Sequence, residues 1–485
     1  MPNNQQTITI TPGGFCPNWF DNTWPYLGNK YHASDMVSID LTDPNCMTQG
    51  PGTADLTAGT QAGAVTTLIT SILHTAVASD VTYAIGGAKI YKISSTAVTN
   101  DGTYPMTIDK GTVTAEDADD LVYYKSNLYV FYNHSGSAGD IAKITLSTNA
   151  LDADWGSTVP TGMATLVDAV HYAINGGDDV VYFTNGQYIG TISGTTLATT
   201  ALDFWTNSQV VSLTWNGNRV YAAVNRPNIT GSNFNESGIY RWNGVSSSWE
   251  GDPIEVSGEL GALYTKNGTT FVWHKDAIDT GGYWLSRING AALEPLRRYS
   301  GSLPTHTQVG EKGGFLMWVS NNKVFMFGAA DAGLSTHLFQ YMSGKHATIG
   351  TISAPFGTIL VSSNLTTSYA LSKESGYTVT SSWKSMAFPV SGAGTKFQID
   401  RIWVNTEQLS TGAKVDFTLY YDQGKSSKAL TQIAYATTNK TRHKILNRGP
   451  QVENFRIDID FTNGSIVNNV KIRSIEVEGH PILST

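Results

Sequence analysis

Residues 210–224 read VVSLTWNGNRVYAAV, and this stretch sets the pattern for most of the chain. Two runs rich in β-branched, apolar and aromatic residues flank Asn216-Gly217, a pair that tolerates the positive φ angles of a tight hairpin turn. Such runs around such a turn predict two adjacent antiparallel strands. Asn267-Gly268 and Asn321-Asn322 occupy the same place in later stretches. We therefore expect an all-β fold.

The same unit recurs along the chain. Its other copies are VTYAIGGAKIYKI from Val81, LVYYKSNLYVFY from Leu121, AVHYAINGGDDVVYFTNGQYIGTI from Ala169, LGALYTKNGTTFVWH from Leu260, GGFLMWVSNNKVFMFG from Gly313 and, in a weaker form, GTILVSSNLTTSYALS from Gly357. Their starts lie roughly 40 to 50 residues apart, the length of a four-stranded propeller blade. Three strands are visible in each copy, and the fourth is expected in the less regular stretches between copies. Residues 59–381 are therefore predicted to form a β-propeller of six to eight blades.

The pattern changes near residue 382. Longer alternating strands follow, and in FRIDIDFTN the apolar residues Phe455, Ile457, Ile459 and Phe461 stand at every second position. Residues 382–485 are therefore predicted to form a separate C-terminal β-sandwich, which limited proteolysis would release intact. Residues 1–58 are rich in aromatic residues but aperiodic, and we predict that they form an N-terminal arm or docking segment.

The composition restricts the classes of function. Only 14% of the 485 residues are charged, and the formal net charge is -8. Proteins that follow the phosphate backbone need clustered lysine and arginine, so sequence-specific nucleic-acid binding is not expected. The longest apolar-leaning run, residues 64–78, is shorter than the roughly 20 residues of a membrane helix, and the first residues lack the pattern of a secretory signal. We expect a chain made in the cytoplasm and not inserted into a membrane.

A search for catalytic motifs finds none that is specific. The sequence has no GxSxG elbow, no HExxH pair and no phosphate-binding loop, because Gly424-Lys425-Ser426 lacks the upstream glycine at the required spacing. The blade signature of sialidases is also missing. The ten histidines are scattered singly, and Cys16 and Cys46 are isolated, so both are expected to be buried thiols. We predict no catalytic residue, no cofactor and no bound metal, and hence no enzyme activity.

Two groups of residues leave alternatives open. An acidic cluster offers oxygen ligands of the kind that Ca²⁺ binds, but it lacks the spacing of a known loop and is better explained as a solvated turn before the strand at Leu121. This cluster consists of Glu116, Asp117, Asp119 and Asp120. Aromatic residues on a polar β-scaffold can also stack on sugar rings, although packing between blades is the favoured interpretation here. The tryptophans concerned are Trp215, Trp242, Trp273 and Trp284.

Residues 36–57, MVSIDLTDPNCMTQGPGTADLT, precede the predicted propeller, and the predicted sandwich ends in VKIRSIEVEG. In this layout, which covers nearly the whole chain, the protein resembles the propeller-bearing tail-nozzle and head-completion proteins of short-tailed bacteriophages. The resemblance implies a virion structural protein of the tail or neck, made in the host cytoplasm. It also implies a cyclic homo-oligomer, commonly a hexamer, around the channel for DNA ejection. Its partners would be other virion proteins, such as a portal adaptor or tail fibres.

Two other functions stay open. The first alternative is a phage receptor-binding or carbohydrate-binding tail protein, and the second is a propeller hydrolase with inward carboxylates. For the structural role, we expect the aromatic residues of the N-terminal arm to contribute to a docking surface, because subunit contacts are enriched in such residues. They are Phe15, Trp19, Phe20, Trp24 and Tyr26. The competing interpretation is that the arm covers one face of its own propeller.

Overall fold

The computed structural model of the protein describes residues 5–10, 33–43, 46–58, 65–75, 81–95, 97–99, 101–109, 116–134, 139–156, 163, 170–177, 179–226, 236–277, 281–328, 337–343, 348–365, 368–377, 380–385, 387–390, 395–435, 440–462 and 470–483. The all-β prediction is confirmed, because the helices within these ranges are two short 3₁₀ turns, η2 (His306–Gln308) and η3 (Pro355–Gly357). None of the described helices is long and apolar enough to span a membrane.

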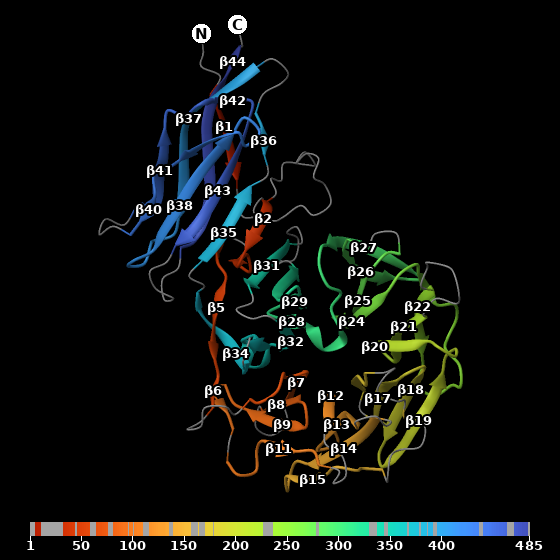
Figure 1. The fold of residues 1–485 in the computed structure, drawn as a ribbon. Helices are drawn as coiled ribbons and strands as arrows, with labels where there is room; N and C mark the ends of the chain where they lie inside the picture. Colours follow the sequence, from red (N-terminus) through yellow and green to blue (C-terminus); the bar gives the residue numbers. More distant parts are fainter. Residues whose placement is uncertain are drawn as a thin grey trace.

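Seven small sheets follow one another along the chain, and Figure 1 shows them arranged around a common centre. The first contains β7 (Ser71–Thr75), β8 (Val81–Gly86), β9 (Lys89–Ile93), β10 (Ala97–Val98) and β11 (Met106–Thr107). The second contains β12 (Glu116–Tyr124), β13 (Asn127–His134), β14 (Gly139–Thr145) and β15 (Ala150–Asp152). The third contains β16 (Ala173–Gly176), β17 (Val180–Asn185), β18 (Tyr188–Ser193) and β19 (Thr196–Asp203).

The remaining four sheets repeat this arrangement. The fourth contains β20 (Gln209–Asn216), β21 (Arg219–Arg226), β22 (Glu236–Trp242) and β23 (Ile254–Val256). The fifth contains β24 (Leu260–Lys266), β25 (Thr269–His274), β26 (Tyr283–Asn289) and β27 (Ala292–Tyr299). The sixth contains β28 (Val309–Lys312), β29 (Phe315–Ser320), β30 (Lys323–Gly328) and β31 (His337–Ser343). The seventh contains β32 (Thr348–Ser353), β33 (Leu360–Leu365), β34 (Ser368–Tyr377) and, from far earlier in the chain, β5 (Pro51–Asp55).

The predicted hairpin turns are confirmed. Gly217 has a φ of 69° in the turn between β20 and β21, and Asn267 has a φ of 47° between β24 and β25. Asn321 and Asn322 have φ angles of 47° and 60° between β29 and β30. The fourth strands also lie in the irregular stretches where they were expected, as β19 and β27 illustrate.

The first strands of the seven sheets, here called the inner strands, lie next to one another. Each inner strand contacts the inner strand of the following sheet, and β32 of the last sheet contacts β7 of the first. At the outer side, β5 pairs antiparallel with β34, and β6 (Thr57–Ala58) pairs parallel with β10. The consecutive strands β5 and β6 therefore link the seventh sheet to the first.

Two larger sheets form the C-terminal part of the protein, at the top of Figure 1. One contains β1 (Gln6–Ile10), β37 (Thr395–Thr406), β41 (Arg442–Asn447), β42 (Gln451–Val452) and β44 (Ile472–Leu483). The other contains β2 (Ala33–Val37), β35 (Thr380–Ser385), β36 (Phe388–Pro389), β38 (Lys414–Tyr421), β39 (Ser426–Ala429), β40 (Ile433–Ala434) and β43 (Asn454–Thr462). Buried residues of both sheets share one hydrophobic cluster, which includes the four alternating residues predicted on β43. We call these the C-terminal sheets.

The N-terminal 58 residues contribute strands to both parts of the molecule. β1 pairs with β44 and β2 pairs with β35 in the C-terminal sheets, whereas β5 completes the seventh small sheet. Between them, β3 (Ile39–Asp40) and β4 (Thr48–Gln49) form a two-stranded sheet, and β3 contacts β31. The short apolar runs of this segment are therefore paired with strands that lie hundreds of residues later.

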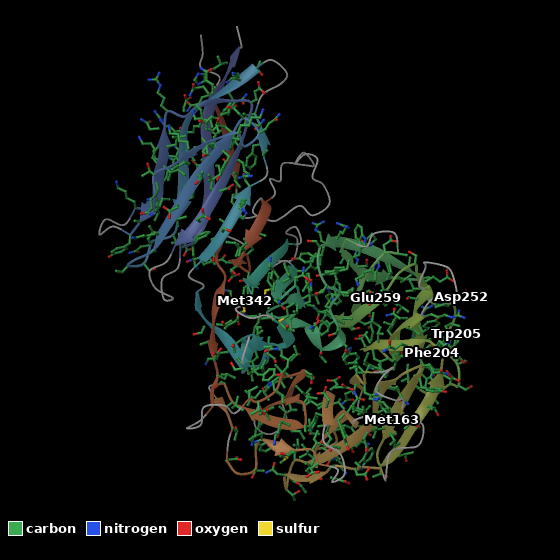
Figure 2. All side chains as sticks on the ribbon, viewed as in Figure 1. Met163, Phe204, Trp205, Asp252, Glu259 and Met342 are labelled. Carbon is green, nitrogen blue, oxygen red and sulfur yellow. The ribbon has the colours of Figure 1, made fainter. Side chains whose placement is uncertain are left out.

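The hydrophobic cluster of the C-terminal sheets continues into the last two small sheets. Met317 and Met326 from the sixth sheet and Ile352 from the seventh belong to the same cluster as Phe417 and Ile457. Met342 on β31 lies where the small sheets approach the C-terminal sheets (Figure 2). The two parts of the molecule thus share a core.

Candidate functional site

The predicted docking residues cannot be placed. Phe15, Trp19, Phe20, Trp24 and Tyr26 all lie outside the described residues. Cys16 also lies outside them. Cys46 is fully buried, as predicted for that thiol.

Two of the four tryptophans considered for sugar stacking are packed in the core, and Trp215 and Trp284 are half-buried. Trp242 and Trp273 are at most 1% exposed, which confirms the packing interpretation for these two residues. The Trp215 ring stacks on Tyr182 of the preceding sheet, with ring centroids 5.8 Å apart.

The interpretation of the acidic cluster as a solvated turn is wrong. Glu116, Asp117, Asp119 and Asp120 lie within β12, not before it. Asp120 is only 4% exposed and Glu116 only 9%. The register of β12 against β13 shifts between Ala118 and Asp120, so Asp119 is an extra residue in the strand. In a regular strand, consecutive side chains point to opposite faces of the sheet. The bulge at Asp119 changes this alternation, so that the carboxyl groups of Asp119 and Asp120 both reach neighbouring sheets.

Asp120 is held by three hydrogen-bond donors on inner strands of three sheets. Ser71 Oγ on β7 donates to Oδ1 at 2.6 Å, and the backbone N–H of Leu121 donates to the same oxygen at 2.8 Å. The backbone N–H of Ala173 on β16 donates to Oδ2 at 2.8 Å. The carboxyl group thus joins the inner strands of the first three sheets.

Asp119 makes a further link from β12 to the segment that leads into β16. Its Oδ2 accepts hydrogen bonds from Asn133 Nδ2 at 2.7 Å and from the backbone N–H of His171 at 3.0 Å. The His171 ring is buried and donates through Nδ1 to the carbonyl oxygen of Thr184 at 2.9 Å. A Cβ at Gly139 would lie 2.0 Å from His171 Nε2, so only glycine leaves room for this ring.

His306, on η2, faces Asp120 from the opposite side of the centre. Its Nε2 lies 4.0 Å from Asp120 Oδ2, and its side chain is 13% exposed. The Nδ1 atom lies 2.8 Å from Ser212 Oγ on β20. The Tyr172 ring packs against the imidazole with centroids 5.0 Å apart.

Burial determines the electrostatics of this centre. Desolvation raises the pKa of Asp120 to about 6 and that of Asp119 to about 7, with a smaller contribution from repulsion between Asp119 and its acidic neighbours. Desolvation lowers the pKa of His306 to about 4. At neutral pH the histidine is therefore uncharged, and it gives Asp120 no positive partner.

A cavity of about 460 Å³ lies among the inner strands at this point. All seven small sheets contribute to its lining, together with η2. Hydroxyl groups recur around it, at Ser71, Thr214, Thr265, Thr307, Thr351 and Ser353. Asp120 and His306 are the titratable groups that face each other across it, and His74, Tyr264 and Glu311 also belong to its lining. We call this site the central cavity.

A second polar cluster lies beside the C-terminal sheets. Asp43, Cys46 and Glu407 offer ligand atoms within 4.8 Å of one another, the one such group of three in the described part of the chain. Lys471 Nζ lies 3.7 Å from Asp43 and 3.4 Å from Glu407. Desolvation and the hydrogen bond to Asp43 raise the pKa of Cys46 to about 12. The lysine thus supplies the positive charge, and the thiol keeps its proton at neutral pH.

An aromatic cluster lies on the outer side of the fourth sheet. The Phe204 ring stacks on Trp249 at 5.5 Å between centroids, and Trp205 lies 5.1 Å from Trp249. The Arg226 guanidinium lies 5.3 Å from the Trp205 ring centroid, and Trp205 is 37% exposed. Figure 2 shows Phe204 and Trp205 at the periphery of the small sheets, away from the inner strands.

Comparison with known proteins leaves the family open. No protein-family model and no curated protein matches the chain. The extracellular domain of a protein described as a hybrid two component system from B. thetaiotaomicron is similar with a TM-score of 0.47 and 11% identity, covering 75% of this chain and 44% of that one. This chain therefore spans less than half the length of that structure.

Two further solved structures are less similar. The computationally designed Ika8 protein has a TM-score of 0.39 and 12% identity, covering 72% of this chain and 98% of that one. An exo-beta-1,3-galactanase from Phanerochaete chrysosporium has a TM-score of 0.33 and 9% identity, covering 89% of this chain and 100% of that one. Likenesses at this level carry no argument about function.

Proposed function

We propose that the protein is a structural component of a bacteriophage tail or neck, with no enzyme activity of its own. In this proposal the seven small sheets are the blades of one β-propeller, which β5 closes, and the C-terminal sheets form a β-sandwich. β1 and β2 then belong to the sandwich and β5 to the propeller.

The observation that carries the proposal is the mechanical continuity of the molecule. One hydrophobic cluster extends from the C-terminal sheets into the sixth and seventh small sheets. The segment from β2 to β5 is paired with strands of both parts. A chain built as one stiff body suits a particle component that must transmit force, whereas relative domain motion is the usual expectation for weakly joined domains. The phage-like layout, with residues 36–57 ahead of β7 in the chain, supports the same assignment.

The path of DNA follows from the size of the central cavity. The major groove of a DNA duplex is alone about 12 Å wide. A cavity of about 460 Å³, lined by residues of all seven small sheets, is too small for a duplex. In this proposal DNA therefore passes between subunits of a cyclic oligomer, commonly a hexamer, and the acidic balance of the chain limits its adhesion to the phosphates. The N-terminal aromatic residues, outside the described ranges, are the proposed docking surface.

Antibody labelling of intact particles tests the proposal. Antibodies raised against the purified chain are added to phage particles from the source culture and viewed by electron microscopy. We expect label at the tail or neck of the particles. Particles that carry no label, although the chain is detected free in the same lysate, would contradict the structural role.

A carbohydrate-binding tail protein is the second candidate, because of the aromatic cluster. Trp205 is partly exposed and packs against Tyr240 and Trp249, and the Arg226 guanidinium lies beside its ring. A sugar ring can stack on such a surface. Glycan binding by the isolated chain that disappears with Trp205→Ala would favour this candidate over a purely structural role.

A further inference from the structure

The protonation of His306 follows from its contact with Ser212. Ser212 is fully buried, and its Oγ accepts a hydrogen bond from the backbone N–H of Leu263 at 2.9 Å. A buried hydroxyl also needs an acceptor for its own proton, and His306 Nδ1 at 2.8 Å fills that need. The neutral imidazole then carries its proton on Nε2, the atom that faces Asp120 across the central cavity.

The resulting N–H group and the Asp120 carboxyl group do not reach each other. Their separation of 4.0 Å exceeds the 2.7 to 3.2 Å range of a hydrogen bond by about 1 Å. One oxygen atom placed between them can lie about 2.8 Å from both. That oxygen has to accept a hydrogen bond from His306 Nε2–H and donate one to Asp120, which a hydroxyl group does and an ammonium or carboxylate group does not.

The size and lining of the central cavity narrow the choice of molecule. Its volume of about 460 Å³ is far above the roughly 30 Å³ that one water molecule occupies, and it falls within the range of small-molecule sites. No lysine or arginine belongs to its lining among the described residues, and Asp120 is negative near neutral pH, so anions are disfavoured. The recurring serine and threonine hydroxyls alternate with aliphatic side chains such as Leu121 and Ile174.

We propose that the central cavity binds a neutral polyhydroxylated molecule of about monosaccharide size, one of whose hydroxyl groups accepts from His306 Nε2 and donates to Asp120 Oδ2. The site does not depend on the virion role, and it is separate from the exposed aromatic cluster around Trp205. Sugar rings combine several hydroxyl groups with apolar C–H faces, which matches the mixed lining. The remaining hydroxyl groups of the ligand would meet the threonines around the cavity.

Two substitutions of His306 separate ligand binding from folding. Asparagine carries an acceptor near the position of Nδ1 and satisfies Ser212, but it has no donor near Nε2. Glutamine carries a donor near Nε2 and lacks the acceptor beside Ser212. A third variant, Ser353→Phe, fills the cavity from a residue of β32 that lines it. Lys125→Ala on the surface is the control.

The experiment measures binding of D-galactose, D-glucose and glycerol to the purified full chain by saturation-transfer NMR and calorimetry. We expect at least one of these probes to bind, His306→Asn and Ser353→Phe to weaken it about tenfold or more, and His306→Gln and the control to keep it within about threefold. Thermal unfolding establishes that each variant is folded. If His306→Asn does not fold, Ser353→Phe alone decides the outcome.

Two results would overturn the inference. The first is that a probe binds and that neither His306→Asn nor Ser353→Phe changes its affinity. That result would place the ligand outside the central cavity. The second is no binding of any of the three probes at millimolar concentration, together with a high-resolution crystal structure, soaked with the same probes, in which water alone bridges His306 and Asp120.

Discussion

Asp119 and Asp120 make the protein less stable as the pH rises, whereas most carboxyl groups on a protein surface have the opposite effect. Burial raises the pKa of Asp119 from 3.8 to about 7. An acid with a higher pKa in the folded state binds its proton more tightly there than in the unfolded chain. The free energy of unfolding therefore falls as the pH rises from about 4 through 7, and above that range the full cost of the buried charge remains.

The buried histidines have the opposite effect on stability below about pH 6.5. Desolvation lowers the pKa of His171, and it lowers those of His274 and His306 to about 4. These groups stay neutral when folded but become protonated in the unfolded chain, so they reduce stability as the pH falls below 6.5. Between about pH 6.5 and 8 these histidines contribute little, and Asp119 dominates the pH dependence of the central site.

Replacing Asp119 by asparagine tests this account. The two hydrogen bonds recorded for the carboxyl group go to one oxygen, Oδ2, so an amide oxygen can accept both. We expect Asp119→Asn to stabilise the protein at pH 8 by about 1 to 3 kcal/mol and to remove a loss of about 1 kcal/mol between pH 6.5 and 8. Urea unfolding at several pH values measures both. Parallel pH profiles for wild type and variant would contradict the assignment, and Asp203→Asn on the exposed face of β19 is the control.

The central site was only partly predictable from sequence. The acidic residues near Leu121 stand out in the sequence, but a run of carboxyl groups beside a strand usually faces solvent. Their burial comes from β7, β16 and η2, which no local pattern connects to them. His306 is a lone histidine in an irregular stretch, so its position opposite Asp120 became evident only from the arrangement of the inner strands.

At the scale of single elements, hairpins were predictable and strand β5 was not. A hairpin needs two apolar runs and a turn pair that accepts positive φ, and all of these are local, as at Asn216-Gly217. β5 has the sequence PGTAD, which contains proline and glycine and reads as a loop. Its pairing with β34 depends on residues such as Ser372, whose Oγ donates to Asp55 at 2.6 Å across 317 positions of sequence.

Strand β5 is expected to matter more for stability than other outer strands. Thr53→Pro combined with Ala54→Pro removes two adjacent backbone N–H donors. Successive N–H groups of a strand point to opposite edges, so one of the two points toward β34. We expect a loss of about 3 kcal/mol or more, because the first and seventh sheets would lose their outer link. The matched control is Leu151→Pro with Asp152→Pro on β15, an outer strand that pairs only with β14 in the described topology. Equal losses of stability in both variants, measured by thermal unfolding, would argue against a special role for β5.

At the scale of the whole molecule, the C-terminal sheets depend on the N-terminal segment. The alternation on β43 correctly predicted an apolar face, and Phe455, Ile457, Ile459 and Phe461 are buried on it. The edge pairing of β1 and β2 with these sheets was not predictable, because each is a five-residue strand in an aperiodic segment. The boundary between the two parts is therefore not a single point in the chain.

This dependence reverses the expectation from sequence that residues 382–485 are released intact, and it leads to a new prediction about that fragment. Residues 382–485 alone lack β1, β2 and the first residues of β35, so both large sheets would present unpaired edges. We expect this fragment to aggregate or to unfold at a temperature well below that of the full chain. Co-expression with residues 1–43 should restore a soluble complex, which size-exclusion chromatography detects. A fragment 382–485 that is monomeric and as stable as the full chain would show that the N-terminal strands are dispensable.

The position of β5 in the chain also affects the order in which the strands pair during translation. Asp55 leaves the ribosome long before its partner Ser372, which lies 317 residues later. At translation speeds of about 5 to 20 residues per second, this interval is roughly 15 to 60 s. Throughout that time the early strand has no partner, while the sheets between are completed in order. The pairing of β5 with β34 therefore waits until about three quarters of the chain has been synthesised, and in this interval a second nascent chain on the same messenger has the same strand to offer.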